Sequence, residues 1–130
     1  MSSLNSDFFG KKILVVEDND TSSVYFGAAI RRMNATFISA KNGKEAVEIF
    51  KEDNQIDLVL MDLNMPEMDG FEATKIMKLL RPEVPIIAQS AYVLSGEETR
   101  SIDAGCNEFL AKPVRLSLLA EALHRNLYQV

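Results

Sequence analysis

Short apolar runs alternate with longer stretches of helical periodicity along the chain, and this alternation constrains the fold more than any other feature of the sequence. Five runs have the length and composition of strands: Ile13–Val16, Thr36–Ser39, Leu58–Met61, Ile86–Gln89 and Glu108–Ala111. Several are almost continuous in Val, Ile and Leu, as strands covered on both faces are. Strands that alternate with helices in this way predict a parallel sheet with right-handed crossover connections.

Apolar residues between the predicted strands recur at the spacing of one helix face. They form three stripes: Phe26, Ile30 and Met33; Ala73, Met77 and Leu80; and Leu116, Leu119, Leu123 and Leu127. Capping residues followed by Glu three positions later predict helix N-termini at Asn42, Asp69 and Ser95. We therefore expect an α/β fold, a flavodoxin-like doubly wound (βα)5 unit whose five parallel strands lie in the order 2-1-3-4-5.

Length and composition indicate one domain. A chain of 130 residues, 47% of them apolar, can bury a single core but is too short for two. Residues 11–130 are predicted to form this domain, and residues 1–10 a polar tail or the remnant of a linker. The first ten residues lack the basic start and apolar run of a signal peptide.

Charge and cysteine content argue against several classes of function. The net charge is -5 and no long basic run occurs, so we expect no nucleic-acid partner. The single cysteine, Cys106, allows no intrachain disulfide and favours a reduced, cytoplasmic compartment. The apolar runs are much shorter than a membrane span, so we expect no membrane contact by this domain.

Polar side chains follow four of the predicted strands at the point where each strand ends. They are Glu17 and Asp18 after the first strand, Asp62 after the third, Ser90 after the fourth and Lys112 after the fifth. Open α/β sheets bind their ligands beyond the carboxyl ends of the strands. The sequence therefore predicts that three carboxylates, a hydroxyl and an ammonium meet at one edge of the sheet.

Carboxylates this close together need a positive partner. Two unit charges about 4 Å apart repel by roughly 4 kcal/mol at an effective dielectric constant near 20. Lys112 offsets part of this repulsion, and a hard divalent cation would offset more. Magnesium takes an octahedron of oxygens, often one or two carboxylates with waters and phosphate oxygens. Asp18, Asp62 and the backbone carbonyl of Asn64 are the expected ligands, with Glu17 holding a metal-bound water.

Four segments carry a family resemblance that covers about Lys11 to Tyr128. They are Ile13–Asp18, Leu58–Gly70, Ile86–Ala91 and Ala104–Pro113. In their order and spacing, these segments resemble the receiver domain of two-component response regulators and hybrid histidine kinases. The segment from Met61 to Thr74 is more similar to receivers of hybrid kinases, so we favour a hybrid origin, with a stand-alone receiver as the other reading.

The resemblance implies a role for each polar residue at the strand ends. Asp62 corresponds to the phosphoacceptor, Glu17 and Asp18 to the acidic pair that organises Mg²⁺, Ser90 to the switch hydroxyl, Lys112 to the lysine that pairs with phosphoryl oxygens, and Phe109 to the aromatic gate. Ser replaces the more common Thr at the hydroxyl, and Phe replaces the more common Tyr at the gate. The resemblance also implies a cis peptide bond at Lys112–Pro113.

The implied function is phosphorelay signalling by a switch that is not an enzyme but assists its own phosphorylation and dephosphorylation. The phosphoryl donor would be a histidine kinase or a histidine phosphotransfer protein. Ser90 would move to the phosphoryl group, Phe109 would turn inward, and the surface near the fourth helix and the fifth strand would change. A homodimer would use the face formed by the fourth helix, the fifth strand and the fifth helix. By position, Asn64 and Tyr92 flank the path of a hydrolytic water and are expected to tune the phosphoryl lifetime.

Two other functions share parts of this pattern. A phosphatase of the haloacid dehalogenase type also uses an Asp nucleophile with magnesium, and Asp18 and Asp20 superficially fit its motif. That family, however, needs a longer chain. A flavodoxin-like FMN carrier would place a phosphate at the first loop, where Glu17 and Asp18 would repel it. Because fold does not determine function, the site must decide between these alternatives.

Overall fold

The computed structural model describes residues 8–64, 70–91 and 96–128. Its strands are β1 (Lys12–Val16), β2 (Thr36–Ala40), β3 (Leu58–Asp62), β4 (Ile86–Ser90) and β5 (Glu108–Ala111). Its helices are α1 (Asp20–Arg32), α2 (Gly43–Glu52), α3 (Gly70–Leu80), α4 (Glu97–Ala104) and α5 (Leu116–Tyr128). All the strand pairs are parallel, and the order is β2-β1-β3-β4-β5. The predicted fold is confirmed, and each predicted strand is right to within one residue at either end.

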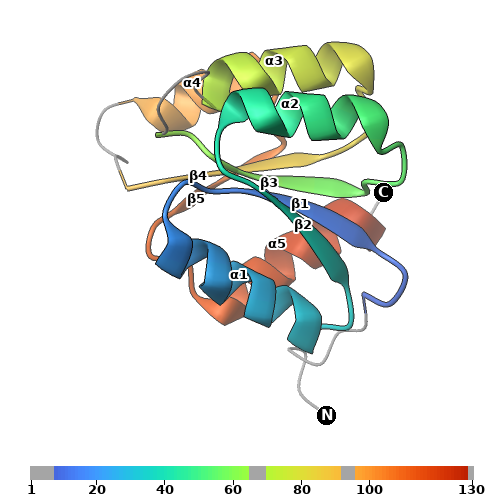
Figure 1. Cartoon of the computed structure of the whole chain (residues 1–130). Helices are drawn as coiled ribbons and strands as arrows, with labels where there is room; N and C mark the ends of the chain where they lie inside the picture. The colour runs from blue at the N-terminus through green and yellow to red at the C-terminus, as the bar shows by residue number, and fades with distance from the viewer. Residues whose placement is uncertain (1–7, 65–69, 92–95, 129–130) are drawn as a thin grey trace.

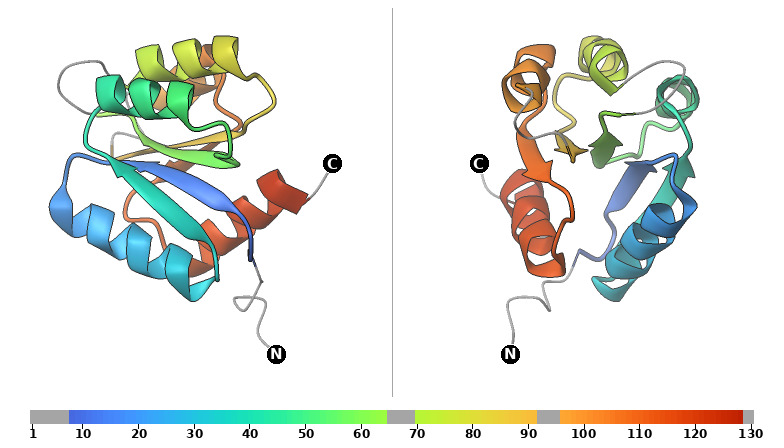
Figure 2. Two further views of the ribbon diagram at one scale, coloured as in Figure 1. Left: turned by 45° about the vertical axis from the view of Figure 1, so that its right-hand side comes forward. Right: turned by 90° about the vertical axis from the view of Figure 1, so that its left-hand side faces the viewer.

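The sheet lies between two layers of helices. Helices α2, α3 and α4 cover one face, and α1 and α5 cover the other (Figure 1). Both layers are visible along the edge of the sheet in Figure 2. Alternate residues of the central strands point to opposite faces, so Leu14 and Val59 join the core under α2 and α3, whereas Ile13 and Leu58 join the core under α1 and α5. Among the described helices, none is long and apolar enough to cross a membrane.

The three central strands are more deeply buried than the two at the edges. Every residue of β3 and β4 is buried, which explains why these strands read as continuous apolar runs. Edge strands β2 and β5 are partly exposed and have more mixed sequences. The burial that made the strands recognisable therefore follows from their place in the sheet.

The helix starts agree only in part with the predicted caps. Asn42 caps α2, because its side chain accepts a hydrogen bond from the amide of Glu45 at 2.8 Å. Helix α4 begins at Glu97 after the N-cap Gly96, so the prediction that Ser95 caps this helix is wrong. The positive φ of Gly96, 79°, sets this start without a side-chain cap. Asp69 and Ser95 themselves lie outside the described residues.

Two apolar residues differ from the expected pattern. Leu80 is 44% exposed although its spacing placed it on the buried face of α3, because it is the last residue of the helix. Phe8 is fully buried, stacks on Tyr128 and donates its backbone amide to the carbonyl of Met33. The packed core therefore reaches back at least to Phe8, before the expected domain start at Lys11.

Candidate functional site

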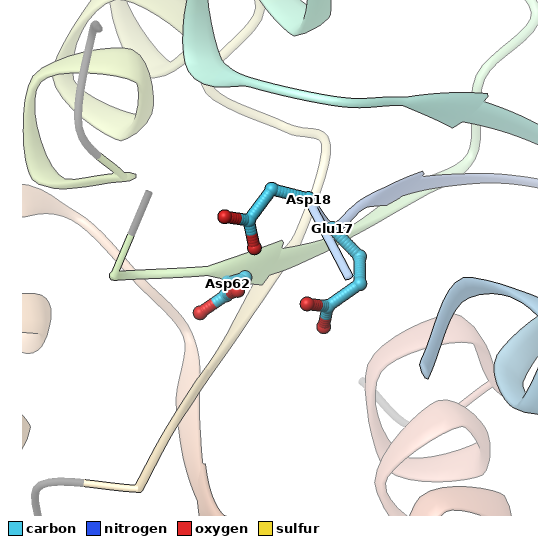
Figure 3. A group of neighbouring side chains, drawn as sticks. All are labelled: Glu17, Asp18 and Asp62. Atoms are coloured by element: carbon cyan, nitrogen blue, oxygen red, sulfur yellow. The ribbon is translucent and has the colours of Figure 1, made fainter. Parts of the chain in front are cut away.

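The parallel register brings three acidic residues together at the carboxyl edge of the sheet. Val16 of β1 pairs with Met61 of β3, so the residues that follow in each strand are neighbours. Carboxylate oxygens of Glu17, Asp18 and Asp62 lie within 4.8 Å of one another (Figure 3). Glu17 and Asp62 are only 3% and 1% exposed, whereas Asp18 is exposed. The predicted acidic cluster is therefore present and opens to solvent on the side of Asp18.

Lys112 supplies a positive charge to this cluster from the end of β5. Its Nζ lies 3.3 Å from Oδ2 of Asp62 and 3.4 Å from Oε1 of Glu17. The backbone amide of Lys112 donates to the carbonyl of Ser90 at 2.9 Å, which fixes the start of its side chain beside β4. One ammonium is too little positive charge to balance three neighbouring carboxyl groups, so the site favours a further cation.

Glu17 shows the electrostatic strain of the cluster. The pKa of Glu17 is raised from 4.5 to about 7, first by burial and then by the negative charge of Asp62, while Lys112 acts in the opposite direction. The amide of Asn19 donates to Glu17 Oε2 at 3.3 Å, and Nε2 of Gln89 donates to Oε1 at 3.4 Å. These donors hold the side chain in place but do not fully offset the loss of water.

Ser90 and Asn64 meet on the other side of Asp62. The hydroxyl of Ser90 lies 2.8 Å from Oδ1 of Asn64, and the amide of Asn64 donates to Oδ1 of Asp62 at 3.1 Å. Ser90 is fully buried at the end of β4. The structure therefore brings together the expected switch hydroxyl, the residue two positions after Asp62, and Asp62 itself.

The remaining predicted site residues are placed as follows. Phe109 lies on β5, half-buried, and packs against the core under α2, α3 and α4. The Lys112–Pro113 peptide bond is cis, as predicted. Tyr92 lies outside the described residues. The contacts of the described residues do not test whether the Asn64 backbone carbonyl is a metal ligand, so this role stays a prediction.

Two polar residues of the site were missed from the sequence. Gln89 is fully buried beside Glu17, and its only signal was an amide within an otherwise apolar run. Glu97 reaches from the first turn of α4 and accepts hydrogen bonds from both Ser90 and Asn64. An acidic residue in the first turn of a helix is common, so nothing in the sequence marked Glu97 out.

Gly70 allows the helix after Asp62 to begin close to the strand. A Cβ added at Gly70 would lie 2.7 Å from the carbonyl oxygen of Asp62 and 2.8 Å from the Cα of Leu63. Both atoms belong to the backbone and cannot move aside as a flexible side chain would. The position therefore requires glycine, and it fixes the distance between α3 and the acidic cluster.

The donor set fits a hard divalent cation. The clustered ligand atoms are all carboxylate oxygens, which magnesium and calcium prefer over the nitrogen and sulfur ligands of transition metals. The exposed Asp18 offers a route for a hydrated ion, and the excess negative charge favours its binding. This is the chemistry expected of a magnesium site beside a group that handles phosphate.

Comparison with known proteins decides the family. The model of the response regulator receiver domain matches residues 13–124 of the chain. The chain belongs to this family. A receiver domain acts in phosphorelay signal transduction, and the match does not favour a phosphatase of the haloacid dehalogenase type.

Relatives of this receiver domain include both separate and embedded receivers. It is 34% identical over 116 residues to the polar-differentiation response regulator DivK of Brucella anthropi. The match covers 87% of this chain and 93% of DivK. It is 36% identical over 119 residues to hybrid signal transduction histidine kinase M of Dictyostelium discoideum. That match covers 87% of this chain but only 5% of the kinase, so the kinase's other activities do not transfer.

Two solved structures are close in both fold and sequence. The receiver domain of sensor histidine kinase PA1611 from Pseudomonas aeruginosa, with a magnesium ion coordinated in its active-site cleft, has a TM-score of 0.85 and 32% identity. The match covers 91% of this chain and 98% of that one. The second is the Saccharomyces cerevisiae co-crystal structure of the phosphotransfer protein Ypd1 with the receiver domain of Ssk1. Its TM-score is 0.84 and its sequence identity is 30%, and the match covers 93% of this chain and 92% of that one.

Proposed function

We propose that Asp62 is the phosphoacceptor of this receiver domain. The observation that carries the proposal is the setting of its carboxylate at the end of β3. It is 1% exposed, lies 3.3 Å from the ammonium of Lys112, and has the acidic pair Glu17 and Asp18 within 4.8 Å. A carboxylate is buried in this way at a cost in stability, and its use as a nucleophile accounts for that cost.

The transfer reaction needs little covalent chemistry from the other residues. The Asp62 carboxylate attacks the phosphorus of a phosphohistidine in line with the leaving nitrogen. A P–O bond forms, the P–N bond breaks, and the released imidazole takes up a proton from solvent. The transition state is loose, and negative charge spreads over the phosphoryl oxygens. Lys112 is placed to stabilise that charge, since its Nζ already faces Asp62.

Asp18, Asp62 and the Asn64 backbone carbonyl would hold the magnesium ion, and Glu17 would hold one of its waters. When bound, the ion supplies positive charge beside the transferring oxygens. The magnesium ion in the cleft of the PA1611 receiver supports this assignment. Few protein ligands are available, so binding without a phosphoryl group should be weak.

Ser90 and Phe109 are proposed to convert phosphorylation into a change of surface. The Ser90 hydroxyl turns to donate a hydrogen bond to the phosphoryl group. Phe109 then turns into the space beside β4 and alters the surface formed by α4, β5 and α5. Complete switching from about 1:99 to 99:1 takes roughly 5.5 kcal/mol of differential interaction. Charge-assisted hydrogen bonds to a phosphoryl dianion can supply a large part of this.

The donor is proposed to be a histidine kinase or a histidine phosphotransfer protein, in line with the Ypd1–Ssk1 complex of the similar yeast receiver. The domain acts as a switch that assists its own phosphorylation and dephosphorylation, and we expect it not to hydrolyse phosphate monoesters. A homodimer through the α4–β5–α5 face and the cytoplasmic location expected from Cys106 remain predictions.

The proposal is tested by phosphotransfer from a radiolabelled phosphohistidine protein at limiting magnesium. We expect the wild-type domain to take up label and Asp18→Ala to take up far less, while neither hydrolyses p-nitrophenyl phosphate. Asp20→Ala, which changes an exposed acid on α1, serves as the matched control and should behave as wild type. Equal labelling of Asp18→Ala, or turnover of the monoester, would contradict the proposal.

A further inference from the structure

A carboxylate from α4 contacts the two polar side chains that flank Asp62. Glu97, the first residue of α4, accepts a hydrogen bond from Ser90 Oγ and one from Asn64 Nδ2, which lies 3.0 Å from Oε2. Ser90 Oγ also lies 2.8 Å from Asn64 Oδ1. Glu97, Ser90 and Asn64 therefore form a triangle of polar side chains, each within hydrogen-bond distance of the other two, that joins α4 to β4 and to the loop after β3.

The triangle is connected to the phosphoacceptor and partly shielded from water. The backbone amide of Asn64 donates to Oδ1 of Asp62 at 3.1 Å. Ser90 is fully buried, and Asn64 and Glu97 are half-buried. Water therefore competes less for the Ser90 hydroxyl than it would at the surface, and the Asn64 backbone connects Asp62 to the triangle.

Ser90 has one hydroxyl proton, and this fact limits what the triangle can do. A hydroxyl donates one hydrogen bond at a time. Of the Glu97 carboxylate and the neutral Asn64 carbonyl, both of which lie beside this hydroxyl, the carboxylate is the stronger acceptor. A phosphoryl group on Asp62 needs the same proton for the switch contact. Ser90 cannot satisfy Glu97 and the phosphoryl group together.

We propose that Glu97 is a latch that holds Ser90 in the unphosphorylated arrangement. The latch rests on the proposed role of Asp62 as phosphoacceptor. The Ser90–Glu97 bond must break before Ser90 can reach the phosphoryl group, and its loss frees the first turn of α4. That turn follows the left-handed Gly96 and has no side-chain capping bond, and the Glu97 carboxylate links it to Ser90 at the end of β4. Glu97 is thus a positioning residue that sets the cost of switching.

Beryllofluoride, which mimics a phosphoryl group on a carboxylate, provides the test. Its affinity is measured by titration calorimetry at saturating magnesium for wild type, Glu97→Gln, and the control Glu98→Gln, which neutralises the exposed neighbouring acid. Replacing a charged acceptor by a neutral one weakens the competing bond, so Glu97→Gln should bind about tenfold more tightly. Glu98→Gln should match wild type. A merely structural residue would lose affinity on substitution, not gain it.

A second pair of variants shows whether Glu97 acts through Ser90. In a Ser90→Ala background no hydroxyl is held, so adding Glu97→Gln should change the affinity by less than about twofold. A tenfold gain that persists without Ser90, or unchanged or weaker binding by Glu97→Gln alone, would overturn the latch. If wild type bound no beryllofluoride at all, while magnesium still bound, the role of Asp62 would be wrong, and this result is distinct from a failed latch.

Discussion

The ammonium of Lys112 lies 3.3 Å from a carboxylate oxygen of Asp62, although the two residues come from strands that are not neighbours in the sheet. Strand β4 separates them, and Lys112 reaches past its end. The pair therefore depends on the packing of the whole carboxyl edge. It also means that Asp62, at 1% exposure, has a cation beside it before any metal binds.

Lys112→Ala should lower both stability and phosphorylation. Removing one partner leaves buried carboxylates without their cation, which costs about 3 kcal/mol in the free energy of unfolding in metal-free buffer. Magnesium should restore part of this loss, because the ion takes over the missing positive charge. Urea unfolding with and without magnesium measures the loss of stability and its partial recovery. Lys44→Ala, at an exposed position of α2, is the control and should be neutral; a similar loss in both variants would count against the pairing.

Glu17 should make stability depend on pH. Its pKa is about 7 in the folded protein and 4.5 in the unfolded chain. A raised pKa means that the folded state binds the proton more tightly, so the contribution is fully present below about pH 4.5 and is lost as the pH rises through 7. A shift of this size corresponds to at most about 3 kcal/mol.

Glu17→Gln removes the titrating group and tests this assignment. In metal-free buffer the variant should lose most of the fall in unfolding free energy between pH 5 and 8 that wild type shows, by roughly 2 kcal/mol. Thermal or urea unfolding across this range gives the comparison. Glu48→Gln, at an exposed site of α2, should retain the wild-type slope. A wild-type slope in Glu17→Gln would show that other groups are responsible.

The sequence predicted the strands and the acidic cluster well because both follow from local rules. Buried parallel strands are continuous apolar runs, and parallel order brings their ends to one edge, so Glu17, Asp62 and Lys112 could be placed together. Glu97 could not be predicted, because its contact depends on where α4 begins. That start is set by the left-handed Gly96 and not by the expected cap at Ser95. Phe8 was missed because two adjacent aromatic residues in a polar segment, Phe8 and Phe9, form no periodic pattern that shows which of them is buried.

The lifetime of the phosphoryl group is expected to be intermediate to long. Asn64 and Tyr92 are not carboxylates and cannot act as good bases for an attacking water. Tyr92→Ala should open the path of the water and speed loss of phosphate. Decay is followed by mass spectrometry at fixed magnesium. Equal or slower decay would show that Tyr92 does not shield the group.

Gly70→Ala should disturb both the fold and the site. The added Cβ would lie 2.7 Å from the carbonyl oxygen of Asp62, so either α3 or the end of β3 must shift. Overpacking of this kind costs about 1–3 kcal/mol, and the shift should also slow phosphorylation. Urea unfolding and labelling by acetyl phosphate measure the two effects. Lys75→Ala, on the exposed face of α3, should leave both unchanged. Unchanged stability and labelling in Gly70→Ala would mean that the close approach of Gly70 to the Asp62 backbone is relaxed in solution.

Intact mass after phosphorylation tests the central assignment most directly. Wild type and Asp62→Asn are each incubated with magnesium and either acetyl phosphate or a phosphorylated histidine phosphotransfer protein, and their masses are compared. Asn keeps the shape of the side chain but is not a carboxylate nucleophile. We predict that wild type gains the mass of one phosphoryl group and that Asp62→Asn gains none. A gain of one phosphoryl group by Asp62→Asn would contradict the assignment of Asp62 as the phosphoacceptor.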